Sequence, residues 1–171
     1  MKQPHWLTPD EQEAWRSFIR LQDKLIGRLA RGLQTESKLS AADYTVLVNL
    51  TDAPAGRLRF LDLAKTVEWE KSRMSHHIAR MTKRGLVTRE ECADDGRGAF
   101  VVITQTGRDA ITTAAPLHVR AVRRLFIDPL TPEELITFAQ LSKRLLEQLE
   151  NGSSPEDGFT PRTQKDRDID C

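Results

Sequence analysis

The sequence predicts an α+β protein that is mostly helical and is built around a winged helix-turn-helix. Three observations indicate this fold class. Apolar side chains recur at helical spacing in residues 60–67, and a second amphipathic helix follows at 71–84 after a tight break. Two strand-like runs then flank a glycine-rich turn. This order of elements is typical of proteins that insert one helix into the DNA major groove.

Two helices are expected before this motif. Thr8-Pro9-Asp10-Glu11 combines a capping hydroxyl, a proline at the first helical position and a glutamate at the third, so a long helix should run from there to about Gln34. Ser40 should cap a second helix, which ends by Asp52-Ala53-Pro54. The short segment Arg57–Arg59 is expected to add an edge strand to the wing.

The helix at 71–84 concentrates positive charge. Between Lys71 and Arg84 there is no Asp or Glu, although the whole chain has 26 basic and 25 acidic residues and a formal net charge of +1. Local charge on this helix, not general attraction, therefore favours nucleic acid. If Met74, Ile78 and Met81 face the core, an outward face with its flanks is predicted to comprise Ser72, Arg73, Ser75, His76, Ala79, Arg80 and Lys83. Glu70 is the expected helix cap, although glutamate caps poorly.

The wing is predicted as a hairpin with strands at Leu86–Glu90 and Phe100–Ile103. Arg97 lies between Gly96 and Gly98, so little surrounds its side chain, which suits insertion into a narrow, electronegative minor groove. Asp95 is expected to hold Arg97 by an ion pair. The alternative is a solvated turn that carries two charges; the preceding basic helix favours the DNA contact.

Two more helices are expected after the wing. Thr104 should cap a helix that runs to about Phe126, with a kink or local break at Pro116. Thr131-Pro132-Glu133-Glu134 repeats the start signal of Thr8 and predicts a last amphipathic helix that ends at Asn151-Gly152.

The long terminal helices have wide apolar stripes, and one small domain has too little surface to bury them. We therefore expect a homodimer that pairs both ends of each chain with those of its partner; the alternative is that these helices fold back on their own core. The predicted division is an N-terminal dimerisation helix (1–36), a winged helix-turn-helix DNA-binding domain (37–103), C-terminal dimerisation helices (104–150) and a disordered tail (151–171).

Other protein classes find little support in the sequence. No apolar run approaches a membrane span and no signal-peptide pattern opens the chain, so a cytoplasmic protein without membrane contact is expected. Cys92 and Cys171 form no disulfide framework, and the four scattered histidines have no zinc-ligand spacing. Paired carboxylates, a nucleophile motif and a phosphate-binding loop are all missing, so we expect neither an enzyme nor a cofactor or metal.

Together these motifs resemble the MarR family of bacterial transcription regulators. The resemblance rests on Leu39–Tyr44 with Val46-Leu47, Asp62–Ala64, Lys71–Ser75, Arg84–Val87 with Arg89, Asp94–Gly98 and Ile103–Gly107. It implies a two-fold dimer that binds a palindromic double-stranded operator, usually as a repressor. By position, it implies that Ser72, Arg73, Ser75, His76 and His77 start the base-reading helix, that Arg97 is the wing arginine, and that Asp95 steadies it.

The resemblance also implies an effector. Many members of the family release DNA when a small aromatic or anionic molecule binds between the dimer helices and the winged domain. Residues that could line such a crevice here are Trp15, Phe18, Ile19, Gln22, Leu47 and His118, although each is alternatively a plain core or interface residue.

Two further functions stay open. A redox switch would use Cys92. Arg89 should lower the pKa of that thiol, but the four nearby acids Glu90, Glu91, Asp94 and Asp95 should raise it. Residues 1–36 also lack the cysteine of the family's one-cysteine peroxide sensors. A winged helix used only as a protein-interaction module is the other possibility. The acid-free basic helix argues against it, because a protein-docking helix has no need for that charge.

Overall fold

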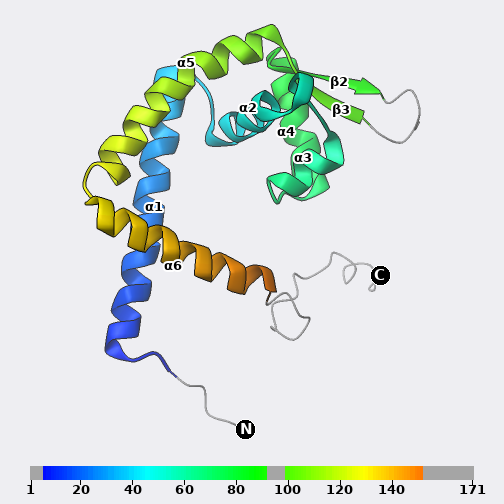
Figure 1. Cartoon of the computed structure of the whole chain (residues 1–171). Helices are drawn as coiled ribbons and strands as arrows, with labels where there is room; N and C mark the ends of the chain where they lie inside the picture. Colours follow the sequence, from blue (N-terminus) through cyan, green and yellow to red (C-terminus); the bar gives the residue numbers. More distant parts are fainter. Residues whose placement is uncertain (1–5, 92–98, 152–171) are drawn as a thin grey trace, which may run out of the picture. The chain divides into compact units, whose positions relative to one another are not determined.

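The computed structural model describes residues 6–91 and 99–151, and the chain divides into two compact units, Met1–Pro129 and Leu130–Cys171. The first unit contains, in order, α1 (Pro9–Ser37), α2 (Ala41–Asp52), the 3-10 turn η1 (Pro54–Gly56), β1 (Arg57–Arg59), α3 (Phe60–Thr66), α4 (Lys71–Lys83), β2 (Val87–Glu91), β3 (Ala99–Ile103), α5 (Gln105–Val122) and the π-helical turn η2 (Arg123–Ile127). The second unit contains α6 (Pro132–Asn151) (Figure 1). This mostly helical α+β fold with a winged helix-turn-helix is the fold class that the sequence predicts.

The predicted helix starts at Thr8, Ser40 and Thr131 are confirmed, and all three use reciprocal capping. Thr8 Oγ1 accepts a hydrogen bond from the Glu11 amide at 3.3 Å, while the Thr8 amide donates to the Glu11 carboxylate at 2.8 Å. Ser40 pairs with Asp43 in the same way at the start of α2, and Thr131 with Glu134 at the start of α6. These ends are set by residues three positions apart, so the sequence alone defines them.

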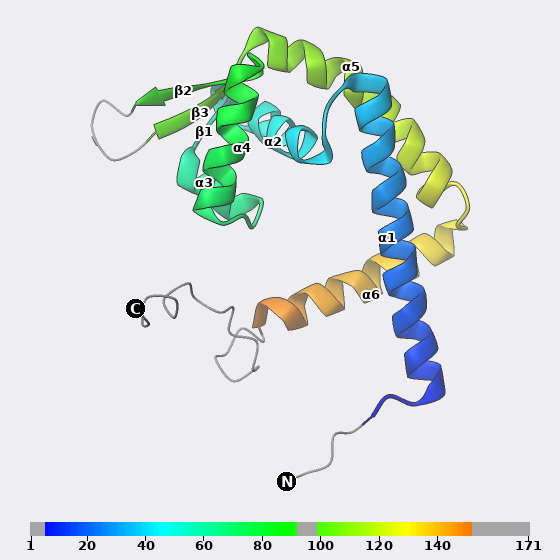
Figure 2. The ribbon, with the colours of Figure 1, turned by 180° about the vertical axis from the view of Figure 1, so that it is seen from behind.

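The core of the winged part lies between three helices and one face of the sheet. The fully buried side chains come from α2, α3, α4 and the strands, and include Leu47, Leu50, Leu63, Met74, Ile78, Met81, Val87 and Val101. The strands are antiparallel in the order β1-β3-β2, so Arg57–Arg59 forms the predicted edge strand (Figure 2). The inward face predicted for α4 is thereby confirmed.

Of the kink or local break predicted at Pro116, the break is absent from α5. The helix continues through that residue, although its ribbon bends along its length (Figure 1). Pro116 is exposed, so water can bond the carbonyl that its missing N–H leaves without a partner. The irregular segment comes later, in the π-helical turn, where the Asp128 amide donates to the Arg123 carbonyl. Helix α1 packs alongside α5 in both views (Figures 1 and 2).

Two helices carry many exposed apolar side chains. On α1 these include Trp15, Phe18 and Ile26, and on α6 they include Ile136, Leu141, Leu145 and Leu146. On α1, Ile26 is 57% exposed, and on α6, Leu145 is 60% exposed. Such exposure is unusual for apolar residues that form a continuous stripe along a helix. Among the described helices, none combines the length and the apolar character needed to cross a membrane.

Candidate DNA-binding interface

Helix α4 has one buried side and one basic side. Met74, Ile78 and Met81 are fully buried, whereas the candidate residues Ser72, Arg73, His76, Arg80 and Lys83 are exposed and Ser75 is partly exposed. The helix cap is Glu70, as expected, and its side chain makes no capping hydrogen bond. The first turn therefore has neither an acidic residue nor a capping side chain, so its backbone amides face outward with positive partial charge.

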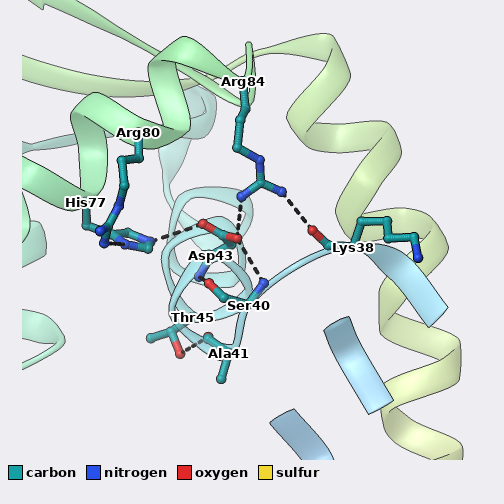
Figure 3. A network of polar contacts seen from close by, with 8 residues as sticks. All are labelled: Lys38, Ser40, Ala41, Asp43, Thr45, His77, Arg80 and Arg84. Atoms are coloured by element: carbon teal, nitrogen blue, oxygen red, sulfur yellow. Dashed lines mark hydrogen bonds and ion pairs between the residues drawn. The ribbon is translucent and has the colours of Figure 1, made fainter. Parts of the chain in front are cut away.

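His77 does not lie on this basic side. Only 5% of its surface is exposed, and Nε2 lies 3.2 Å from Oδ1 of Asp43 in α2 (Figure 3). The family motif suggested a base-reading role, but His77 is three residues after Met74 and therefore lies beside the buried stripe. Its neighbour His76 is exposed. We correct the prediction by leaving His77 out of the DNA-contacting set.

Asp43 is the centre of a buried polar cluster. Its side chain, 4% exposed, accepts hydrogen bonds from the Ser40 amide at 2.9 Å and from Arg84 Nη1 at 2.6 Å (Figure 3). Burial raises the pKa of the Asp43 carboxyl, but the polar contact with His77 and the hydrogen bonds from Arg84 and Ser40 outweigh burial and hold the pKa well below its ordinary value. Asp43 therefore stays ionised, and it connects the start of α2 to the recognition helix and its end.

The contacts of His77 indicate which ring nitrogen carries the proton. Arg80 Nη2 lies 3.2 Å from His77 Nδ1. A guanidinium group only donates hydrogen bonds, so Nδ1 accepts and the proton of the neutral ring is on Nε2, facing Asp43. The Nε2–H group makes no well-aligned hydrogen bond, so its contact with the carboxylate is chiefly electrostatic.

Arg73 is also held by a neighbour. Its guanidinium carbon lies 4.4 Å from the ring centroid of Trp69, the half-buried residue that precedes the α4 cap. The Trp69 ring meets the His77 ring edge-on, with centroids 5.3 Å apart and planes at 86°. Sequence analysis did not single out Trp69. The available signal was an aromatic residue four positions before an arginine at the start of a basic helix.

The base of the wing is locked to the end of α4. Thr104 Oγ1 donates to the Gly85 carbonyl at 2.6 Å, and the Gly107 amide donates to Thr104 Oγ1 at 3.0 Å. On the outer face of the sheet, Arg57 stacks over Phe100 at 3.9 Å. The predicted wing-tip residues Asp95 and Arg97, together with Cys92, lie outside the described residues and remain predictions.

A groove lies between α1, α2 and α5. Its volume is about 330 Å³, and it is lined by Ile26, Leu29, Ala30, Leu33, Ala41, Tyr44, Thr45, Val48, Asn49 and His118. The rings of Tyr44 and His118 are 4.5 Å apart, and burial lowers the pKa of His118 below its ordinary value. No lining side chain carries a permanent charge.

The six predicted effector residues are not brought together. His118 lines this groove, whereas Leu47 is fully buried in the core. Trp15 and Ile19 line a separate open surface along α1, and Phe18 and Gln22 line neither. Sequence analysis did not predict the other lining residues, among them Tyr44, whose expected roles were a hydrophobic staple with Leu39 and a place in the family motif.

Residues 37–98 match a family model described as the MarR family. The structure superimposes on AbsC, a MarR family transcriptional regulator from Streptomyces coelicolor, with a TM-score of 0.82 and 41% identity, covering 86% of this chain and 99% of that one. The chain belongs to the MarR family of transcriptional regulators.

Two further transcriptional regulators are similar to this chain over most of their length. Sco3205 from Streptomyces coelicolor, crystallised in complex with DNA, has a TM-score of 0.82 and 37% identity, and the alignment covers 92% of this chain and 97% of that one. The transcriptional regulator HosA from Escherichia coli is 28% identical over 131 residues, which are 77% of this chain and 95% of HosA. The resemblance inferred from short motifs is thus confirmed.

Proposed function

We propose that this MarR-family regulator binds double-stranded DNA sequence-specifically, as a homodimer, with α4 in the major groove. The observation that carries the proposal is the basic, acid-free exposed side of α4 opposite its buried methionine stripe. The contacting residues are Ser72, Arg73, Ser75, His76, Arg80 and Lys83, with Arg97 and Asp95 added from sequence alone. The DNA complex of Sco3205, at 37% identity, supports this proposal.

Binding-site selection from a random duplex library tests this function directly. We expect one enriched palindrome whose half-sites lie roughly 10 bp apart, because two recognition helices must enter successive major grooves. Fluorescence anisotropy on the selected duplex should then show weaker binding for Arg80→Ala. The matched control is Arg144→Ala, which removes an exposed arginine from α6 and should bind like the wild type. No enrichment, or equal losses from the two variants, would refute the proposal.

Exposed apolar surfaces support the proposed division into functional segments. The apolar stripes of α1 and α6 are exposed in the single chain, and pairing with a second copy would bury them. We therefore propose that 1–36 and 104–150 form the dimer contacts and 37–103 the DNA-binding domain, as the sequence predicts.

We further propose that the protein is a repressor that a small aromatic molecule releases from DNA, and that the effector occupies the groove of Tyr44 and His118. Two ring faces and apolar neighbours favour an aromatic ligand. The absence of a permanent charge among the lining side chains gives less support to an anion. His118 Nδ1 is buried and has no hydrogen-bond partner among the described residues, so it offers a polar contact.

A library of small aromatic compounds, neutral and anionic, tests the effector proposal. Compounds that raise the melting temperature of the protein should also release the selected duplex, and their effect should be lost in His118→Leu. Hits that act equally on wild type and His118→Leu would place the effector elsewhere. Hydrogen peroxide in the same release assay tests the redox alternative, with Cys92→Ser as its control.

A further inference from the structure

We propose that the Trp69–His77 pair positions the guanidinium groups of Arg73 and Arg80 for DNA contact. Trp69 and His77 are then positioning residues that act through the two arginines, although neither belongs to the basic side of α4. The inference rests on the proposed function, because positioning matters only if α4 binds DNA. The geometry itself can be tested without DNA.

The four residues Arg73, His77, Arg80 and Arg84 follow one another at spacings of four, three and four. They therefore lie on one stripe of α4, directly beside the buried stripe of Met74, Ile78 and Met81. An arginine that leaves a helix at this edge can turn toward the protein or toward solvent. The neighbouring residue that such an arginine contacts determines the position of its guanidinium group.

Trp69 provides that contact for Arg73. Its ring centroid is 4.4 Å from the Arg73 guanidinium carbon, and its backbone amide donates to the Ala64 carbonyl at 2.9 Å in the turn between α3 and α4. Glu68, just before it, has a left-handed φ of 54°, so the turn has a defined shape that presents the indole. Stacking occupies the face of the guanidinium group and leaves its edge N–H groups available to bases or phosphates.

His77 provides the contact for Arg80. Its ring is buried between the edge of Trp69 and the carboxylate of Asp43, and its Nδ1 accepts from Arg80 at 3.2 Å. Only one N–H group of Arg80 is used in this way, so the others remain available. Asp43 is in turn held by Arg84 and Ser40, so the imidazole cannot turn without disturbing the start of α2.

The two arginines therefore share one support. Arg73 rests on the face of Trp69, Trp69 meets the ring of His77 at a right angle, and His77 receives Arg80. A long side chain that is already ordered in the unbound protein loses less conformational entropy when DNA binds. Lys83 makes a useful contrast, because it lies on the same helix and has no ion pair with any described residue.

The first experiment measures the geometry without DNA. In the NMR spectrum of protein labelled at arginine, the side-chain protons of Arg73 should be shifted upfield by the indole ring above which they lie. Trp69→Leu should abolish this shift and Trp69→Phe should retain part of it, whereas Trp6→Leu, at an indole that is 80% exposed, should change nothing. An Arg73 signal at the position of an unstacked arginine in the wild type would overturn the inference.

The second experiment measures coupling by double-mutant cycles on the selected duplex. Loss of an exposed cation–π contact should weaken binding by about two- to fivefold in Trp69→Leu. Adding Trp69→Leu to Arg73→Ala should cause a clearly smaller loss than it causes in the wild type, because one of the two arginines being positioned is already gone. Adding Trp69→Leu to Lys83→Ala should multiply the two losses. A parallel cycle pairs His77→Gln with Arg80→Ala.

The possible results distinguish a misfolded variant, a failure of this inference and a failure of the proposed function. Thermal unfolding of every variant identifies those that fail to fold, and Trp69→Phe and His77→Gln provide milder changes at the same positions. Multiplicative losses for Trp69 with Arg73 would overturn the inference while leaving the proposed function intact. A wild-type protein that binds no DNA would overturn the proposed function, and the arginine shift would still report whether the Trp69–His77 pair holds Arg73.

Discussion

Arg84 Nη1 lies 2.6 Å from Oδ2 of Asp43, which joins the end of the recognition helix to the start of α2. The same guanidinium group donates through Nη2 to the carbonyl of Lys38, the residue that ends α1. The Asp43 side chain is 4% exposed and that of Arg84 is 43% exposed, so the carboxylate is desolvated while the arginine still reaches water. Beside the apolar contacts of α4, one buried charge therefore connects the end of this helix to the end of α1 and the start of α2.

Replacing Asp43 should destabilise the protein more than removing an ordinary helix cap. Asp43→Ala removes the carboxylate that Arg84 and His77 contact, and we expect the free energy of unfolding to fall by about 3 kcal/mol, the lower end for a broken buried pair because Arg84 is partly solvated. Ser40→Ala, which removes only the capping hydroxyl, should cost about 1 kcal/mol. Urea unfolding at pH 7 measures both, and equal losses would contradict a central role for the carboxylate.

The same carboxylate predicts a pH dependence. The pKa of Asp43 is lower in the folded protein than its ordinary value of 3.8, so in acid the unfolded chain binds the proton first. The stability from Asp43 is therefore complete above the ordinary carboxyl range and is lost as the pH falls below it. The unfolding free energies of wild type and Asp43→Asn should differ by a constant amount from pH 7 to about pH 5 and converge below about pH 4. A gap that stays constant down to pH 3 would mean that folding does not lower the pKa of Asp43.

Arg73 and Lys83 should make different kinds of DNA contact. Arg73 is near the start of α4 and is held by Trp69, so Arg73→Ala should lose discrimination between the selected duplex and random DNA by about 1–3 kcal/mol if it reads a guanine edge. Lys83→Ala should weaken both duplexes alike and reduce the slope of log affinity against log salt by about one. Anisotropy across a salt series distinguishes them, and identical behaviour would mean that the orientation of α4 on DNA is wrong.

The features that the sequence predicted depend on residues close together in the chain, whereas the features that it did not predict depend on residues far apart. Thr8, Ser40 and Thr131 act on residues three positions away, and the buried side of α4 follows from helical spacing, so these features were predicted and are confirmed. The ion pair of Asp43 with Arg84 spans 41 positions and exists only because α2 and α4 pack together.

His77 illustrates the limit within one helix. Its motif position suggested the surface, but a carboxylate from another element and an indole from the preceding turn draw the ring inward. The effector groove was predicted poorly for the same reason. It takes side chains from α1, α2 and α5, and no spacing within any one of them indicates that they meet.

The apolar stripe of α6 should be needed for dimer formation. Leu145 is 60% exposed in the single chain, and Leu145→Arg would place a charge where a second copy should bury an apolar side chain. We expect light scattering at micromolar concentration to show a dimer for the wild type and a shift toward monomer for the variant. Gln140→Arg introduces the same charge on the opposite, polar side of α6 and should leave the dimer intact. A wild-type monomer would contradict the proposed assembly.

Gly107 should tolerate no side chain, because the base of the wing passes directly over it. A Cβ atom at this buried position would overlap the carbonyl oxygen of Leu86 and lie 2.9 Å from Ile103 Cγ1. The Leu86 carbonyl is backbone, and the hydrogen bonds of Thr104 to this segment prevent it from moving away. Gly107→Ala should therefore lower the free energy of unfolding by about 3 kcal/mol, at the upper end for overpacking.

Gly32 provides the matched control within α1. A Cβ there would have no neighbour within 4 Å, so Gly32→Ala should stabilise the protein by about 0.4–1 kcal/mol by restricting the unfolded chain. Both variants add one methyl group to a helix, so helix propensity alone predicts that both are stabilising. Urea unfolding of the two variants separates these explanations. If Gly107→Ala were as stable as the wild type, the contact between α5 and Leu86 would not restrain the wing, and the Thr104–Gly107 motif would be only a helix cap.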